Sequence, residues 1–284
     1  MKKIIQNPKT GHITIDISAL PQCGKNGVLV KTYYSLISSG TEKNTVETAK
    51  KSLLGKAKKR PDLLGKIIDF SKKEGIKSAY NLIQSRLTTP LQLGYSCVGE
   101  VIEVGENEKN IMVGDVVACA GAGYATHAEV NFIPSNLVSK VPDGVSYKDA
   151  AYSTLGAIAL HGVRQSSASI GDSVCILGMG LIGCLTAQLL KAQGCRLICI
   201  DVSEKALSSL DGFVSENDLK INSSKDSGLK KIQSFTRGRG VDRVIIAASS
   251  KDSSLINYSV EVLRDRGTLV ILGDLKVDIP REPF

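Results

Sequence analysis

Apolar and polar residues alternate in two parts of the first half of the chain, and this period of two is typical of β-strands. Near the N-terminus, Ile13, Ile15 and Ile17 alternate with polar residues, and a second β-prone run follows at residues 28–32. Residues 91–141 contain further β-prone runs that are separated by glycines. Short strands with glycine-rich turns predict a small barrel-like β domain.

The period changes at Lys148, where short apolar runs begin to alternate with segments of helical spacing. Such alternation predicts a doubly wound parallel sheet. The expected strands are residues 173–178, 196–201, 242–248 and 268–273, and the expected helices are residues 148–166, 181–193, 203–210, 226–236 and 252–263. The polar stretch 211–226 supports no confident assignment. The chain therefore divides into two predicted domains, 1–147 and 148–284.

A third pattern occupies residues 45–90, where helical periodicity is interrupted by glycines and a proline. We interpret this segment as three short helices inserted into the first domain. It contains eleven Lys or Arg and four Asp or Glu, so it carries +7 of the net charge of +8. The insert is either a solvated helical surface or a region that attracts an anionic substrate, nucleic acid or a membrane surface. No aromatic residues interleave with the lysines, so nucleic acid is not an expected partner.

Composition narrows the class of protein further. The chain is 42% hydrophobic and 23% charged, as ordinary globular proteins are, and it has no apolar run of the roughly 18 residues that a membrane span needs. Its first residues lack the apolar core of a signal peptide. The seven cysteines are scattered and form no C-x-x-C, which is typical of reduced thiols. These observations predict a cytoplasmic protein with no membrane partner.

The most informative stretch is VCILGMGLIGCLTAQLLKAQGCRLICID, residues 174–201, which is expected to form strand, glycine turn, helix, strand and acid. Gly178, Gly180 and Gly183 make the G-x-G-x-x-G pattern that binds a dinucleotide between a strand and a helix. The first glycine permits the tight turn, the second lets the backbone approach a pyrophosphate, and the third lets the helix pack on the strand. The first helical turn, with Leu181 and Ile182, would present free N–H groups to the phosphates.

The acidic end of the second strand indicates which dinucleotide binds. Asp201 can accept hydrogen bonds from both hydroxyls of the adenosine ribose, whereas a 2′-phosphate would meet its negative charge. NAD is therefore the expected cofactor, and NADP is disfavoured. Ala248 and Gly273 follow or end predicted strands, so they should line the same crevice at the carboxyl ends of the parallel strands.

The chain resembles the medium-chain dehydrogenase/reductase superfamily, in which a GroES-like β domain precedes a Rossmann domain. The segment SSGTE (38–42) resembles the family's C-G-T-D, LGYSCVGEVIEVG (93–105) resembles G-H-E-x-x-G-x-V-x-x-V-G, and VGDVVA (113–118) resembles G-D-R-V. The run 150–163 resembles the helix that enters the nucleotide domain, where Thr154 matches a position near the nicotinamide. The resemblance implies hydride transfer between NAD and an alcohol or carbonyl compound.

The metal positions of the family differ in this chain. Zinc-dependent members bind the catalytic metal through a Cys and a His, and the matching residues here are Ser39 and Tyr95. Hydroxyls are poor zinc ligands beside thiolate and imidazole, and the four-cysteine structural zinc lobe is absent. We therefore expect neither zinc. His127 and His161 lack a third soft ligand at suitable spacing; His161 is expected in the core or behind the site, and His127 either faces the cleft or caps a strand.

Without zinc, other groups must polarise the substrate oxygen. Tyr95 is a candidate hydrogen-bond donor to a developing alkoxide. Ser39 or Thr41 would relay a proton, with Glu42 as the orienting or basic group. The alternative for Thr41 and Glu42 is that they only fix the loop.

Within the superfamily, the insert between GTE and LGYS resembles a bacterial zinc-less branch in which this module is fused to a second oxidoreductase domain of sugar or polysaccharide metabolism. The resemblance implies a small-molecule sugar or polyol substrate, with a homo-oligomer or a second oxidoreductase domain as the protein partner. The sequence ends where the family's return to the catalytic domain should begin, so a C-terminally truncated chain is expected. The alternative function is a non-catalytic NAD-binding module that needs a partner domain.

Overall fold

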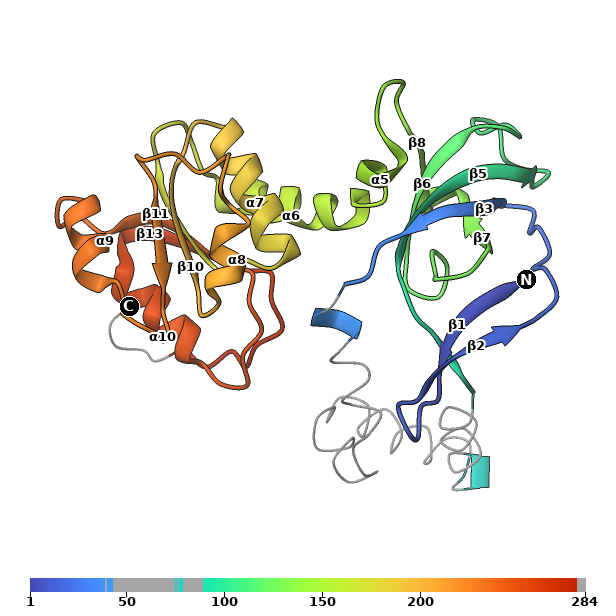
Figure 1. Cartoon of the computed structure of the whole chain (residues 1–284), viewed down its shortest axis with the longest axis horizontal. Coiled ribbons are helices and arrows are strands. Elements are labelled where there is room, and N and C mark those ends of the chain that lie inside the picture. Colours follow the sequence, from blue (N-terminus) through green and yellow to red (C-terminus); the bar gives the residue numbers. More distant parts are fainter. Residues whose placement is uncertain (39, 43–74, 76, 79–88, 280–284) are drawn as a thin grey trace. The chain divides into compact units, whose positions relative to one another are not determined.

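The computed structural model describes residues 1–38, 40–42, 75, 77–78 and 89–279 (Figure 1). These residues form two compact units, Met1–Thr154 and Leu155–Phe284. The predicted insert at 45–90 lies almost wholly outside the described residues. The sequence had placed the domain boundary at 147/148, a few residues before the division that the contacts give.

The first unit is built on a curled antiparallel sheet with the strand order β7-β3-β5-β6-β8. Its strands are β3 (Gly27–Ser35), β5 (Ser96–Val104), β6 (Val116–Ala120), β7 (Val130–Pro134) and β8 (Val138–Lys140). Buried β-branched residues on β3, β5, β6 and β7 form its core: Val28, Val30, Val101, Val117 and Ile133. This curled sheet corresponds to the barrel-like β domain that the short strands and glycine-rich turns predicted.

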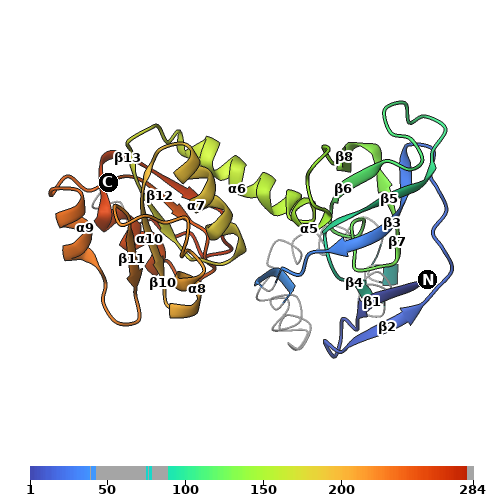
Figure 2. The same ribbon diagram turned by 45° about the horizontal axis from the view of Figure 1, so that its top comes forward.

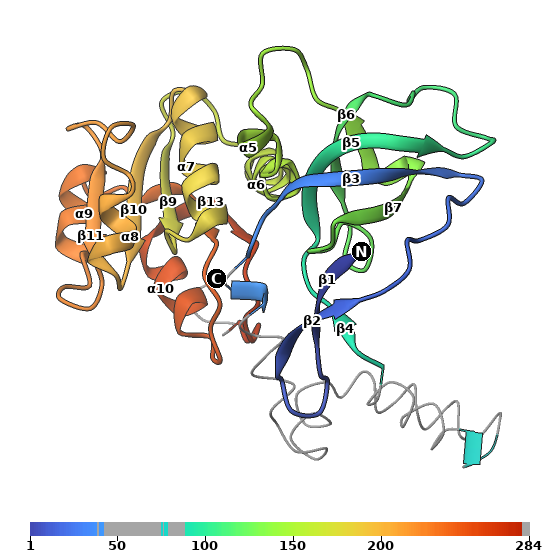
Figure 3. The ribbon, with the colours of Figure 1, turned by 45° about the vertical axis from the view of Figure 1, so that its right-hand side comes forward.

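A smaller sheet with the order β2-β1-β4 completes this unit (Figure 3). It contains β1 (Lys2–Gln6), β2 (Ile13–Ile17) and β4 (Leu91–Gln92). The alternation at Ile13, Ile15 and Ile17 does form a strand, but the isoleucines are 46%, 69% and 78% exposed on this edge strand. An isolated β-bridge between Lys3 and Ala128 and neighbouring backbone hydrogen bonds connect the small sheet to the segment before β7.

The second unit is a five-stranded parallel sheet with the order β11-β10-β9-β12-β13. The strands are β9 (Ser173–Leu177), β10 (Arg196–Asp201), β11 (Leu219–Asn222), β12 (Val241–Ile246) and β13 (Leu263–Ile271). Helices cover both faces, as Figure 2 shows. The observed architecture confirms the predicted half-barrel followed by a doubly wound parallel sheet.

The continuous apolar strands of this sheet contribute side chains to two hydrophobic cores, one on each face. Val174 and Ile176 of β9 pack with α6 (Ser153–Ser166), α7 (Leu181–Ala192) and α8 (Glu204–Ser208). Cys175 and Leu177 point to the other face, where α9 (Leu229–Phe235) and α10 (Ser254–Val262) cover them. Alternate residues of one strand thus fix helices on opposite faces, which makes β9 the centre of the unit.

One carboxylate ties together the amino ends of three strands in this sheet. Asp242, at the start of β12, accepts a hydrogen bond from the backbone N–H of Ser173 at the start of β9 (2.8 Å). The same carboxylate accepts one from Nε of Arg264 in β13 (2.6 Å). The Asp242 carboxylate therefore holds the amino ends of these strands together, at the end of the sheet opposite to the glycine turn.

Two expected element boundaries were wrong, and one strand was not expected. The helix expected at 148–166 is broken into α5 (Tyr147–Ala150) and α6, because the chain turns at Ala151 and Tyr152. Strand β11 lies in the stretch for which the sequence supported no assignment, since four residues give too short a pattern to recognise. Strand β13 starts at Leu263, five residues before the predicted start. None of the described helices is both long enough and apolar enough to span a membrane.

Candidate cofactor and catalytic sites

The glycine turn between β9 and α7 is shaped by three different steric requirements. Gly178 has a φ of +97°, which side-chain-bearing residues rarely adopt. A Cβ on Gly183 would lie 1.9 Å from the carbonyl oxygen of Gly178, so the helix can pack this closely only on a glycine. A Cβ on Gly180 would meet nothing within 4 Å. The middle glycine is therefore not required by packing, and it leaves open space beside the turn.

Gly180 is also the N-cap of α7, and it supplies no side-chain bond to the first turn of that helix. The N–H groups at a helix start have no partner within the helix and carry partial positive charge. Leu181 and Ile182 are half-buried in this first turn. The open space at Gly180 thus faces donors that suit a phosphate.

The Asp201 carboxylate lies at the end of β10, directly beside this turn. Its Oδ2 accepts a hydrogen bond from the N–H of Met179 (2.7 Å), and its Oδ1 accepts one from the N–H of Ser203 (2.8 Å). Each carboxylate oxygen has a further lone pair. Asp201 therefore fixes the glycine turn and can still accept bonds from ribose hydroxyls.

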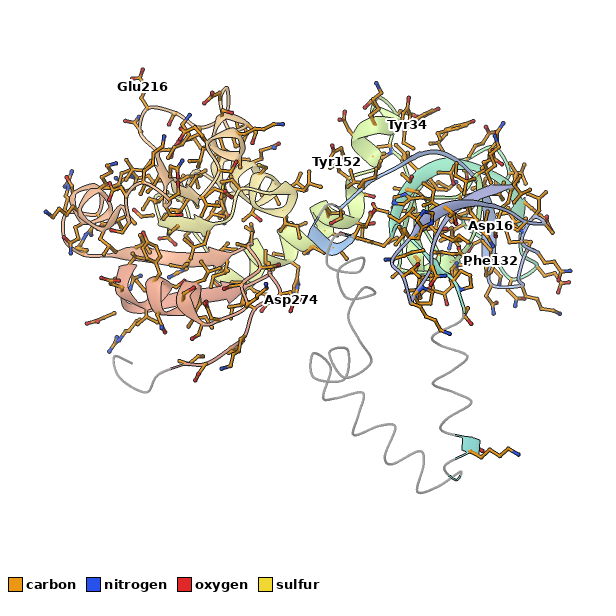
Figure 4. The ribbon with its side chains drawn as sticks, turned by 60° about the horizontal axis from the view of Figure 1, so that its bottom comes forward. Asp16, Tyr34, Phe132, Tyr152, Glu216 and Asp274 are labelled. Carbon is orange, nitrogen blue, oxygen red and sulfur yellow. The ribbon has the colours of Figure 1, made fainter. Side chains whose placement is uncertain are left out.

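The ends of β9, β12 and β13 converge through small residues. A Cβ on Gly178 would lie 2.7 Å from Cβ of Ala248, and a Cβ on Gly273 would lie 1.8 Å from the carbonyl oxygen of Ala248. Beyond Gly273, Asp274 (labelled in Figure 4) accepts a backbone bond from Ser250 at 3.1 Å. The structure thus brings together every predicted cofactor residue except Thr154, which belongs to the first unit.

The SSGTE segment in the first unit is held by Glu42. Glu42 Oε1 accepts a hydrogen bond from the N–H of Ser38 (3.1 Å), and Ser38 Oγ bonds Thr41 Oγ1 (3.3 Å). The Glu42 side chain is 16% exposed. Ser39, the candidate relay residue, lies outside the described residues.

The LGYS segment is held mainly by its backbone. The carbonyl oxygen of Tyr95, a half-buried residue, accepts a bond from the N–H of Gly121 (2.9 Å). Ser96 Oγ donates to the carbonyl oxygen of Ala151 at 2.7 Å and is buried. Thr154 Oγ1 donates to the carbonyl oxygen of Cys119 at 3.4 Å. The serine that follows Tyr95 is thus a structural residue.

His127 is a residue whose role the sequence left open. Its Nε2 lies 3.1 Å from Glu42 Oε1, and its Nδ1 lies 2.8 Å from Ser35 Oγ. The sequence gives little indication that His127 and Glu42 are in contact, because the two residues are 85 positions apart. His161 is exposed on α6, so its expected place in the core was wrong.

Metal-ligating side chains were sought in the part of the chain that the structure describes, which does not include Ser39. Among the described residues, no three His, Cys, Asp or Glu side chains are grouped so that they could hold a metal. The thiolate is the form of cysteine that binds zinc. Burial raises the pKa of the Cys199 thiol to about 12 and also raises that of Cys175. These thiols therefore stay protonated in the core.

The known proteins to which this chain is similar in sequence are dehydrogenases. Residues 182–283 match the family described as zinc-binding dehydrogenase. D-arabitol-phosphate dehydrogenase of Enterococcus avium is 26% identical over 214 residues, which cover 66% of this chain and 60% of that protein. L-idonate 5-dehydrogenase of Vitis vinifera is 28% identical over 184 residues, which cover 54% of this chain and 50% of that protein.

The fold also matches solved structures over the whole chain. Alcohol dehydrogenase TADH from Thermus sp. ATN1 superposes with a TM-score of 0.73 at 19% identity, covering 100% of this chain and 80% of that one. At this identity the likeness shows the fold alone. In sequence, the chain spans 60% or less of the two curated relatives named above.

Proposed function

Since the chain belongs to the alcohol dehydrogenase-like medium-chain dehydrogenase/reductase superfamily, we propose that it is an NAD-dependent oxidoreductase. It would move a hydride to or from a sugar alcohol or the corresponding carbonyl compound. The open space at Gly180, between the tightly packed Gly178 and Gly183, is the observation that carries this proposal.

The parallel unit supplies what NAD needs. The N–H groups at the start of α7 would hold the pyrophosphate, and Asp201 would accept bonds from the adenosine ribose. A negative carboxylate at that position disfavours a 2′-phosphate, so NAD should bind more tightly than NADP. Bound NAD supplies a hydride acceptor at its nicotinamide ring.

The first unit supplies the groups for the proton. We assign hydrogen-bond donation to the substrate oxygen to Tyr95, and proton transfer to Ser39 and Thr41 with Glu42 as the basic or orienting group. Because Ser39 and Tyr95 stand where zinc-dependent relatives have a Cys and a His, we propose a zinc-independent reaction. That assignment rests on the chemistry of the side chains present.

The substrates named for the two relatives suggest a substrate class for this chain. An arabitol phosphate and an idonate are both polyhydroxylated anions. The insert at 45–90 carries a net charge of +7, which would raise the local concentration of such a substrate. We therefore propose an anionic sugar derivative or polyol as the substrate. A second oxidoreductase domain or another copy of the chain remains the proposed protein partner.

The alternative function is binding of NAD without catalysis in this chain. The replacement of both metal-ligand types, at Ser39 and Tyr95, is the observation that favours it. The two functions differ in turnover and agree on NAD binding, so one experiment with two stages separates them.

The first stage is a fluorescence titration with NADH and with NADPH. We expect NADH to bind more tightly, and Asp201→Ala to weaken NADH by about 10- to 100-fold, since two or more hydrogen bonds to a charged group are lost. Asp201→Asn keeps the shape without the charge and should narrow the preference for NADH over NADPH. Glu216→Gln, on an exposed residue of the same unit (Figure 4), is the control.

The second stage measures NADH formation with D-arabitol phosphate, L-idonate and the uncharged parent polyols. Turnover with the anions supports the dehydrogenase, and NADH binding without turnover on a wide polyol screen supports the alternative. Failure to bind either dinucleotide would contradict both functions.

A further inference from the structure

A buried histidine joins the two segments of the first unit that matter for the proposed reaction, and neither motif contains it. His127 is 8% exposed. It precedes β7, whereas Glu42 closes the SSGTE segment, and both His127 and Ser35 at the end of β3 line one groove of about 290 Å³. A polar ring in so apolar a sheet requires partners for both nitrogens.

Both the backbone and the ring of His127 are held by neighbouring residues. The His127 N–H donates to the carbonyl oxygen of Leu93 (2.8 Å), and its carbonyl oxygen accepts from the N–H of Ile4 (2.9 Å). Gly94 has a φ of +93°, and a Cβ there would lie 2.9 Å from the ring. The glycine of the LGYS segment therefore makes room for this histidine.

The two ring contacts determine which nitrogen carries hydrogen. A carboxylate oxygen only accepts, so the proton lies on Nε2 and points to Glu42 Oε1. In the neutral ring, Nδ1 then accepts from the hydroxyl of Ser35. The result is a directed chain from Ser35 through His127 to Glu42.

The same Glu42 oxygen also accepts the N–H of Ser38, so two donors fix its direction. We propose that His127 is a positioning residue for Glu42: its Nε2–H, oriented by Ser35, holds the carboxylate in the direction in which it serves proton transfer to and from the substrate. The inference rests on the proposed function, because it gives Glu42 a task in the reaction.

Nuclear magnetic resonance tests the contact without any substrate. The chain has three histidines, so protein labelled with 15N-histidine gives three imidazole signals, and His127→Asn identifies one of them. We expect that ring to be locked with hydrogen on Nε2. Glu42→Ala should release it to a mixture of tautomers, whereas Glu129→Ala, at a carboxylate that lines the same groove, should not. A ring unaffected by Glu42→Ala would overturn the inference.

Two substitutions of matched chemistry test the role in turnover. A Gln side chain places an amide N–H near the position of Nε2, whereas an Asn side chain reaches only as far as Nδ1. We expect His127→Asn to lower kcat by about 100-fold with KM and NADH affinity unchanged, and His127→Gln to recover most of the loss. His161→Asn, on an exposed histidine of α6, is the control.

The outcomes separate the inference from the function beneath it. Wild-type protein without turnover on the polyol screen overturns the proposed dehydrogenase function. Active wild type with equal kcat in His127→Asn, or equal losses in the Asn and Gln variants that follow their thermal stability, overturns only the positioning role.

Discussion

The glycine turn of the parallel unit is built from backbone, whereas the SSGTE region of the β unit is built from side chains that meet across long stretches of sequence. Gly178, Gly180 and Gly183 lie within six residues, and their spacing between an apolar strand and a helix predicts the turn. Glu42 and His127 are 85 residues apart. A backbone site can therefore be recognised as a local pattern, while a side-chain site becomes visible only once the sheet is formed.

The sharpest test of this comparison adds one methyl group to the backbone site. Gly183→Ala places a Cβ 1.9 Å from a carbonyl oxygen, so we expect a loss of about 1–3 kcal/mol of stability together with NADH binding. Gly180→Ala places its Cβ in open space, so its melting temperature should change little while NADH affinity falls. Thermal unfolding and NADH titration of both variants check this. Similar melting temperatures for the two would contradict it.

A second test removes one oxygen from the side-chain site. Tyr95→Phe deletes the proposed donor to the substrate oxygen, and we expect kcat to fall by about 100-fold, as when one oxyanion donor is removed. NADH affinity should stay as in the wild type, because the glycine turn is untouched. Steady-state kinetics with NADH titration measure both. Unchanged kcat would remove Tyr95 from the site.

A third test concerns Asp218, a carboxylate of the parallel unit that is held by side-chain and backbone hydrogen bonds. The Asp218 side chain is fully buried, and although burial favours its neutral form, hydrogen bonds from Lys191, the N–H of Leu197 and Ser215 lower its pKa. Loss of those bonds in Asp218→Asn should cost about 1–3 kcal/mol at pH 7.

The sign of the pH dependence follows from the lowered pKa. The contribution of Asp218 is fully present above the unfolded pKa of about 3.9 and is lost as the pH falls through the lower folded pKa. The melting temperatures of wild type and Asp218→Asn should therefore converge as the pH falls below about 4. Asp211→Asn breaks an exposed pair with Lys220 and is the control, with little expected change. A constant gap down to the lowest pH would contradict this.

The smallest effect is expected from the insert. Charge reversal at Lys58, Lys59 and Arg60 should raise KM for an anionic polyol a few-fold at low salt, and about 0.15 M salt should reduce the difference by screening. Equal KM values at low salt would exclude the insert from substrate attraction.

The architecture was predictable because the strands of both units have simple apolar patterns. The apolar strands β9, β10 and β12 were placed to within two residues at each end, since two buried faces need continuous apolar runs. Strand β11 was not assigned, because its four residues are too few to show an apolar or alternating pattern. Its pairing with β10 forms it in the folded protein. The break between α5 and α6 has no proline or glycine to mark it.

The candidate sites divide in the same way. The glycine pattern and Asp201 were predicted from spacing, and the structure brings those residues together beside one turn. The link from Ser35 through His127 to Glu42 could not be predicted, because it depends on the register of β3 and on room made by Gly94. Ser39 stays a prediction, as does the role of the insert.

The carboxylate of Asp242 binds the amino ends of β9 and β13, while the carboxyl ends meet through Ala248 and two glycines. The two ends of the parallel sheet are therefore held by different means, a carboxylate at the amino ends of the strands and close packing of small residues at their carboxyl ends. A larger side chain is not accepted freely at the carboxyl ends, since a Cβ on Gly178 or Gly273 would lie within 3 Å of Ala248. We expect descendants of this domain to retain both Asp242 and these two glycines.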